Sequence, residues 1–531
     1  MRRLIRPSGI AAVTVALCIL VCVGATALPA ATPTHRVLGA NSLGMHCYDT
    51  DFSIFSILPP YNEVRAQVVR IGAHPVILGP GRAKMRYLAQ ADPSGSINST
   101  SAGKTNFWEF LPDLFSVSRP VDVGIQGARM PGLANTPRAF SRFDARTRSF
   151  IVDGIPITQI DNEGNRNPYP LMRVIARSLT GAPLASLKVV VPVSDEMDCD
   201  NCHLTGGEGA DDPGITWSGH ADPEIQYRQN ILLLHDDRSG TDLVSSLPVL
   251  CARCHYSAAL DLAGTGPTPQ QADQPYLSRA IHGTHAGLIP QDPGGLGTCF
   301  SCHPGRNTQC LRGAMSAAGI ECLDCHGTMA AVGKSSRDPW VDEPLCQSCH
   351  TGDALANHQG RIVRRTAYAD DADTATPLVV ANKRFAEQPG KLYRDSVGHG
   401  GVACISCHGS PHAEWPSREP NDNIAATALQ GHAGTITECS ACHGSRLALT
   451  LKGPHGMHNV GGQAWVEGHE DFFERSRASC QTCHGKLGQG TVISKTKADR
   501  VYALEEGGVV RLFRGTPVGC GHCHENPFLE G

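Results

Sequence analysis

The chain has 531 residues, a formal net charge of −4, 22 cysteines and 24 histidines, but only 5% aromatic residues. This length allows more than one domain. Both signs of charge are spread along the chain without a long basic run, which excludes nucleic acid as an expected partner. Because aromatic side chains supply much of an ordinary core, their scarcity favours a core built around a bulky ligand.

The N-terminus has the pattern of an export signal. A positively charged start, residues 1–6, precedes an apolar stretch at residues 10–23, and residues 25–27 supply a small-x-small cleavage pattern. The apolar stretch is shorter than the ~20 residues that a spanning helix needs. We therefore expect residues 1–27 to be a removed signal peptide. The mature chain is then exported, to the periplasm or to the cell surface and beyond, without an integral membrane segment.

The next part, residues 28–198, has the pattern of strands. Short runs alternate polar and apolar residues, and Pro, Gly, Asn and Asp separate them. The runs lie at residues 64–69, 84–90, 171–177 and 186–193. We expect an all-β, sandwich-like domain without a cofactor of its own, serving as a scaffold rather than as a docking surface.

One short segment of this part, residues 161–165, places oxygen donors around a glycine. Such a segment could hold Ca²⁺ or form a hairpin turn. The incomplete spacing of the oxygen ligands favours the turn.

From residue 199 onward, the cysteines follow one pattern. Nine Cys-x-x-Cys pairs are each followed directly by His, whereas a random chain of this composition would contain roughly 0.04 such pentapeptides. The cysteines are Cys199, Cys202, Cys251, Cys254, Cys299, Cys302, Cys322, Cys325, Cys346, Cys349, Cys404, Cys407, Cys439, Cys442, Cys480, Cys483, Cys520 and Cys523. The histidines are His203, His255, His303, His326, His350, His408, His443, His484 and His524.

This spacing suits covalent attachment of haem. Two thiols three positions apart on one turn can add to the two vinyl groups at a haem edge, and the next residue then stands under the iron. A structural zinc site would need paired knuckles, a thioredoxin-like centre needs a single pair, and a disulfide framework explains neither the gap nor the His. We expect nine haems c in a loop-rich domain, residues 199–531, with short α-helices that carry the motifs and macrocycles that fill the core.

A low-spin haem needs a second axial ligand, usually His or Met. The preferred candidates are histidines in loops near a motif: His235, His282, His285, His399, His412, His432, His455, His458 and His469. His46, His220 and His358 are reserves, Met315 and Met457 are weaker competitors, and we expect His35, His74 and His522 to have no such role. Two imidazoles on most irons predict low reduction potentials, because a Met ligand raises them.

With these motifs, the chain resembles the multihaem c-type cytochromes over roughly residues 199–524. Several phrases are also similar to large exported cytochromes of metal-respiring bacteria: LGMHC, SILPPYN, VSDEMDC, QCLRG and GHGGVACISCHGSPHAEWP. The resemblance implies bis-histidine haems packed closely enough for electrons to hop between them.

Three functions stay open at this point. The leading one is an electron conduit that serves another electron-transfer protein or an extracellular acceptor. The second is a multihaem oxidoreductase with one open-site haem that acts on nitrogen or sulfur oxyanions, although no CxxCK motif occurs. The third shares the conduit chemistry but assembles as a homo-oligomer or a filament. Two leftover cysteines, Cys47 and Cys310, leave a disulfide between the two expected domains open.

Overall fold

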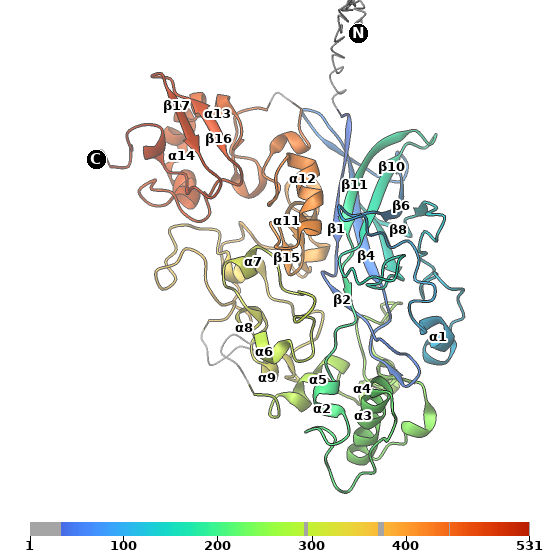
Figure 1. Ribbon diagram of the computed structural model, residues 1–531. Helices are drawn as coiled ribbons and strands as arrows, with labels where there is room; N and C mark the ends of the chain where they lie inside the picture. Colours follow the sequence, from blue (N-terminus) through green and yellow to red (C-terminus); the bar gives the residue numbers. More distant parts are fainter. Residues whose placement is uncertain (1–32, 291–295, 370–375, 445–446, 530–531) are drawn as a thin grey trace, which may run out of the picture. The chain divides into compact units, whose positions relative to one another are not determined.

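A computed structural model describes residues 33–290, 296–369, 376–444 and 447–529. The expected signal peptide, residues 1–27, lies outside the described residues. Small antiparallel sheets lie early in the chain and short helices later (Figure 1). Thr34–Gly531 form one compact unit, and the expected boundary between residues 198 and 199 stays a prediction. The described residues include no helix that is long and apolar enough to cross a membrane.

Two antiparallel sheets build the N-terminal part. The five-stranded sheet has the order β1 (His35–Asn41), β4 (Asn62–Arg70), β9 (Ser149–Ile155) and β8 (Arg142–Asp144), with β5 (Val76–Leu78) also paired to β4. The four-stranded sheet has the order β11 (Pro183–Val190), β10 (Leu171–Arg177), β6 (Lys84–Gln90) and β7 (Arg138–Ala139). The strands expected at residues 84–90 and 171–177 are thereby confirmed, and the run at 64–69 lies within β4.

Four further strand pairs are short, and one of them, β3 with β13, connects this part to the rest of the chain. β2 (His46–Cys47) pairs in parallel with β12 (Val193–Ser194), and β3 (Phe55–Ser56) pairs in parallel with β13 (Val249–Leu250). Two further hairpins lie late in the chain: β14 (Gly409–Ser410) with β15 (Ala413–Glu414), and β16 (Arg500–Ala503) with β17 (Val509–Leu512).

The two large sheets share one hydrophobic core. Val64 and Val68 from β4 lie in it together with Tyr87, Val174 and Val189 from the other sheet, and all five are buried. Burial of each such side chain contributes about 1.5–3 kcal/mol. The N-terminal part therefore has an apolar core made mostly of its own side chains, to which Trp415 and Leu429 from later in the chain also contribute.

Strand β4 is buried on its second face as well, so its polar residues Arg65 and Gln67 are buried although they alternate with apolar ones. Gln67 accepts a hydrogen bond from the backbone N–H of Ala403 (2.9 Å), and Arg65 pairs with Asp395 (2.6 Å). Ala403 also packs with Ile405 in a small apolar cluster against β1. The segment that leads into the sixth Cys-x-x-Cys-His motif thus lies directly on the sheet.

The helices are short, with one exception. They are α1 (Phe107–Phe115), α2 (Asp200–His203), α3 (Pro223–Ser239), α4 (Pro269–Ala272), α5 (Leu277–His285), α6 (Leu296–Cys299), α7 (Ala314–Ala317), α8 (Cys322–His326), α9 (Met329–Val332), α10 (Cys346–Cys349), α11 (Cys404–His408), α12 (Ile424–Gln430), α13 (Gln463–Gly468) and α14 (Glu470–His484). α14 has 15 residues but contains a kink at Ser476, so α3 is the longest regular helix.

Local sequence explains the length of α3. Asp222 caps its first turn by accepting a hydrogen bond from the backbone N–H of Glu224 (3.0 Å), and Gly240 ends it in the left-handed region (φ 62°). Arg228, in the middle of the helix, is buried and pairs with Glu224 (2.7 Å) and with Asp49 (3.3 Å). The helix is thereby held against the N-terminal part.

The segment at residues 161–165 forms a turn, as favoured by its spacing. The Asp161 carboxylate accepts hydrogen bonds from the backbone N–H groups of Glu163 (2.9 Å) and Asn165 (2.8 Å). Its other oxygen accepts one from the Ser96 hydroxyl (2.9 Å). The oxygens of Asp161 therefore stabilise the turn itself.

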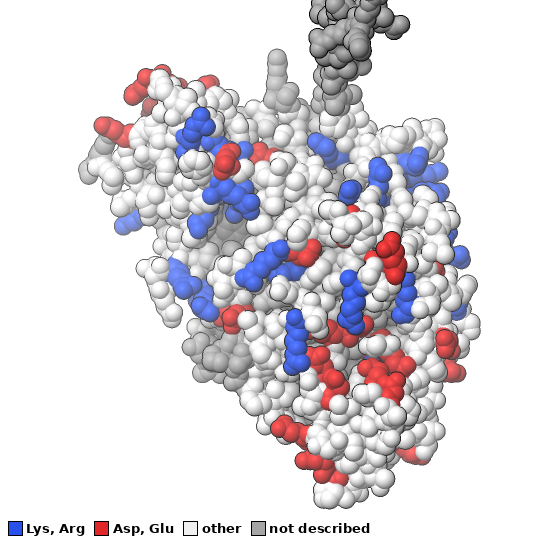
Figure 2. All heavy atoms as spheres, in the orientation of Figure 1, with Lys and Arg blue, Asp and Glu red and all other residues white. Residues whose placement is uncertain are grey.

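Charged side chains of both signs occupy the face drawn in Figure 2. Acidic residues gather there toward the end that carries α2 and α3, further acidic residues lie at the end that carries β17, and basic residues lie mostly between these ends. This face therefore presents mixed charge, not a uniformly basic stripe.

Candidate functional site

Each Cys-x-x-Cys-His motif forms a single helical turn. In the fifth motif, for example, the backbone N–H of His350 donates to the carbonyl of Cys346 (2.8 Å), and in the first motif that of His203 donates to Cys199 (3.0 Å). Six motifs lie in or overlap α-helices, namely α2, α6, α8, α10, α11 and the end of α14. The other three begin with the 3₁₀ turns η2 (Cys251–Arg253), η6 (Cys439–Ala441) and η8 (Cys520–His522). Side chains three positions apart share one face of such a turn, so both thiols of a motif point the same way.

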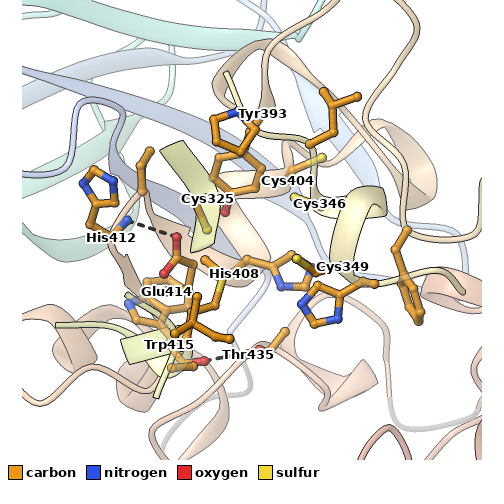
Figure 3. Close-up of a pocket in the computed structure, with 18 of the residues that line it drawn as sticks. Cys325, Cys346, Cys349, Tyr393, Cys404, His408, His412, Glu414, Trp415 and Thr435 are labelled. Atoms are coloured by element: carbon orange, nitrogen blue, oxygen red, sulfur yellow. Dashed lines mark hydrogen bonds between the residues drawn. The ribbon is translucent and has the colours of Figure 1, made fainter. Parts of the chain in front are cut away.

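All eighteen motif cysteines and all nine motif histidines line one cavity of about 4130 Å³. Pockets for single small molecules usually have ~300–1,000 Å³, so this volume suits several large ligands. Figure 3 shows part of the cavity, where Cys325 of the fourth motif, Cys346 and Cys349 of the fifth and Cys404 of the sixth surround a common space.

Eight of the nine motif histidines face a second histidine ring. The pairs, with the distances between ring centroids, are His203–His285 (6.2 Å), His255–His235 (6.2 Å), His303–His282 (5.9 Å), His326–His412 (5.9 Å), His408–His455 (5.9 Å), His443–His399 (6.1 Å), His484–His458 (6.3 Å) and His524–His469 (5.8 Å). With a metal–imidazole nitrogen bond of about 2.0 Å and about 1.1 Å from that nitrogen to the ring centre, two imidazoles on opposite sides of one metal ion have centroids about 6.2 Å apart. All eight pairs therefore have the separation that fits one ion between two rings.

Half of these sixteen rings are oriented by a backbone carbonyl. On α5, Nδ1 of His282 lies 2.7 Å from the carbonyl of Ser278, and Nδ1 of His285 lies 2.8 Å from that of Ile281. The same contact occurs at His255, His443, His455, His469, His484 and His524. Because a carbonyl only accepts, Nδ1 carries the proton and Nε2 keeps its lone pair, the tautomer that suits a metal ligand.

Burial favours the neutral form of the most deeply buried rings. Desolvation lowers the pKa of His203 and of His408 to about 4, and that of His326 to about 3, with a further lowering from the neighbouring histidine in each case. Only the neutral imidazole has a lone pair for a metal. No cluster of three or more His, Cys, Asp or Glu side chains that could hold a bare metal ion occurs within the described ranges.

The preferred candidate His432 and the reserves His46, His220 and His358 lie outside these pairs. His432, a preferred candidate, has Nδ1 3.1 Å from the carbonyl of Ala433 and Nε2 3.2 Å from Glu438, and it does not line the cavity. His46 lines the cavity, but its Nε2 lies 2.8 Å from the carbonyl of Pro59. The ring nitrogens of His432 and His46 that would serve an iron are therefore engaged with protein atoms.

His350 is the exception among the motif histidines. Its ring has no histidine ring against it anywhere in the described part of the chain, and the ring beside it is that of Phe385 (6.1 Å between centroids). The reserve His358 does not line the cavity.

Cysteines of successive motifs are neighbours. The thiol of Cys322 forms a hydrogen bond with that of Cys299, which lowers the pKa of Cys322. Burial and then the charge of Cys349 raise the pKa of Cys325 to about 12. The same kind of relation links three further pairs of successive motifs, Cys346–Cys404, Cys407–Cys442 and Cys480–Cys520, and it also links the first motif to the third through Cys202–Cys302.

The groups that hold the backbone of His412 were not predicted from the sequence. The backbone N–H groups of Arg312 and Gly313 donate to the carbonyl of His412 (2.8 and 2.7 Å), and Glu414 accepts from its N–H (3.0 Å), as Figure 3 shows for the last contact. A side chain at Gly313 would meet the backbone N of Glu414 at 2.4 Å. The phrase QCLRG, which contains Arg312 and Gly313, was the only signal for this arrangement in the sequence.

Cys47 and Cys310 are both free thiols in this structure, and both line the cavity. Burial raises the pKa of Cys47, and the charge of Cys310 raises it further. The sulfur of Cys310 also lies 3.4 Å from Nδ1 of His412. The two thiols are thus neighbours, and the disulfide between them stays a prediction.

Comparison of the chain with known proteins found no matching family model, no matching curated protein and no matching solved structure.

Proposed function

We propose that this chain carries nine covalently bound haems c, most of them with two histidine ligands, and transfers electrons along them. The observation that carries the proposal is the set of eight facing histidine pairs, at 5.8–6.3 Å, in a cavity lined by all eighteen motif cysteines. Each pair has the separation expected for one iron between two imidazoles.

The residues of each motif fit the group. The two thiols on one face of a helical turn would hold the haem edge, the following His would lie under the iron, and the paired His would lie on the other side. Haem iron, when bound, supplies reversible one-electron chemistry. The chain contributes ring orientation through the Nδ1–carbonyl contacts and a cavity wall of apolar and cationic side chains.

The neighbouring thiols of the third to seventh motifs support a path through these five motifs. The pairs Cys299–Cys322, Cys325–Cys349, Cys346–Cys404 and Cys407–Cys442 relate each of these motifs to the next. Haems attached to such thiols would lie edge to edge, which suits electron hopping. In this proposal the two N-terminal sheets are a sandwich-like scaffold that carries the haem-packed part.

The setting we propose is an extracytoplasmic respiratory conduit. The N-terminal export pattern and the resemblance to multihaem cytochromes support this placement. Its partners are other electron-transfer proteins or an extracellular acceptor, and assembly into a homo-oligomer or filament is compatible with the same chemistry.

The first experiment counts haems and follows electrons in the purified holoprotein. Pyridine haemochrome quantification is expected to give nine haems per chain. Stopped-flow reduction by dithionite, followed by reoxidation with a soluble ferric complex, is expected to cycle all of them. A count well below nine, or haems that fail to exchange electrons with the rest, would refute the conduit.

A further inference from the structure

The fifth motif differs from the other eight in what faces its histidine. The ring nearest to His350 belongs to Phe385, at 6.1 Å and an interplanar angle of 76°. A phenyl ring has no lone pair for a metal. The Phe385 ring also lies 4.9 Å from His455, which faces the sixth motif, so Phe385 lies between two neighbouring sites.

The reserve ligands are not placed to replace a facing imidazole. Nε2 of His358 is buried without a hydrogen-bond partner among the described residues, but this residue lies outside the cavity lining and its backbone is tied to Arg361 by two hydrogen bonds (2.8 and 3.1 Å). Lys497 lines the cavity, and its charge acts on His350 and on His408 alike, so it is not specific to the fifth motif.

A second, independent feature marks the same place. Glu387 is only 8% exposed and lines the cavity beside the fifth motif. Its Oε1 accepts a hydrogen bond from the backbone N–H of Cys346 (2.8 Å), and its Oε2 is buried without a nitrogen or oxygen partner among the described residues. The Cys346 thiol also forms a hydrogen bond with this carboxylate, but that thiol would lose its proton when it is joined to haem. Because a buried, unsatisfied carboxylate oxygen costs free energy, we expect a bound molecule to supply that partner.

We propose that the iron held by His350 has no protein ligand on its second face and is a binding site for small exogenous iron ligands, such as carbon monoxide in the reduced state and cyanide in the oxidised state. This inference rests on the proposed haem content. The chain would then have one ligand-binding haem in addition to eight haems that serve electron transfer alone.

The test uses the purified holoprotein and two probes. EPR of the oxidised protein is expected to show a high-spin signal that corresponds to one haem in nine, and cyanide is expected to convert it to low spin. After reduction, carbon monoxide is expected to shift the Soret absorption of the same one-ninth of the haem. A count of nine haems that are all low spin and do not bind carbon monoxide would overturn this inference and leave the conduit intact, whereas a low haem count would refute the conduit itself.

Variants assign the site. Phe385→His would place an imidazole beside His350 at a distance similar to that of the other eight pairs, and it is expected to abolish both the high-spin signal and carbon monoxide binding at an unchanged haem count. Phe385→Leu, the matched control, is expected to keep both. A high-spin signal that survives in Phe385→His would assign it to another motif and overturn the inference.

Two further variants test the reserve ligands. If His358 or Lys497 ligates this iron, the wild-type protein is entirely low spin, and His358→Ala or Lys497→Met gains the high-spin signal. Either gain overturns the proposal. If the proposal holds, both variants keep the wild-type spectrum and the same stoichiometry of carbon monoxide binding.

Discussion

Arg312 and Asp422 form an ion pair that is almost completely shielded from water. Nε and Nη2 of Arg312 lie 2.6 and 2.9 Å from the two carboxylate oxygens, and the two side chains are 0% and 1% exposed. Arg312→Met would leave the Asp422 carboxylate buried without its counter-charge. Removing one partner of such a pair costs about 3–5 kcal/mol, so we expect a loss of that size in the free energy of unfolding of the holoprotein.

The measurement is urea unfolding followed by far-UV circular dichroism, and the chain offers a matched control. Arg142 and Asp153 form an ion pair with the same two-bond geometry (2.7 and 3.2 Å), but the Arg142 side chain is 51% exposed. Arg142→Met is expected to cost only about 0–1 kcal/mol.

The losses in unfolding free energy of the two variants show whether burial makes the Arg312–Asp422 pair important. If Arg312→Met lowers the free energy of unfolding no more than Arg142→Met does, burial does not make the Arg312–Asp422 pair important, and this prediction is refuted. Removing both charges with Arg312→Met and Asp422→Leu is expected to cost less than Arg312→Met alone, because no unpaired charge is left in the interior.

Four further predictions concern the candidate site and the part of the chain around it. His469→Ala is expected to produce an additional high-spin haem by EPR, whereas His432→Ala leaves the spectrum unchanged; the reverse result would contradict the pairing. Spectroelectrochemistry should find most haems below the potential of the standard hydrogen electrode, since imidazole rather than Met faces eight motif histidines, and a set well above it would contradict bis-His ligation. Intact mass after alkylation without reduction should show neither Cys47 nor Cys310 labelled if they form a disulfide, and labelling of both would exclude it. Burial raises the pKa of Glu196, but hydrogen bonds from the loop after the third motif outweigh burial and hold the pKa below its usual value of 4.5. The ionised carboxylate therefore stabilises the fold at higher pH, and this contribution is lost as the pH falls through the folded-state pKa. Glu196→Gln should therefore flatten the acid limb of stability measured by urea unfolding between neutral and acidic pH, and an unchanged limb would count against the contact.

Strands with one buried face were predictable from the sequence, and the strand buried on both faces was predictable only in part. In β6, Met85 and Tyr87 are buried and alternate with exposed residues, so the period of two is visible. In β4, by contrast, Arg65 and Gln67 face the segment that leads to the sixth motif, and burial is nearly continuous. The alternation of residues 64–68 predicts the strand, but it does not show that long-range contacts also bury its polar face.

The motif residues were predictable, whereas the partner of each ring was not. Proximity to a motif in sequence selected eight histidines that the structure places opposite a motif histidine. It also selected His432, whose Nε2 instead lies 3.2 Å from Glu438. Nothing in the sequence indicates that contact. The place of Phe385 beside His350 depends on residues that are 35 positions apart and carried no pattern at all.

Helix α5 carries two of the facing rings on one turn. His282 faces the third motif and His285 the first, and each ring is tied by Nδ1 to a carbonyl of the same helix. One turn of helix rises ~5.4 Å and is among the stiffest short spacers that a chain can make. The separation of these two sites is therefore insensitive to thermal motion of the surrounding loops. Among all steps along the path, this one should depend least on temperature and viscosity.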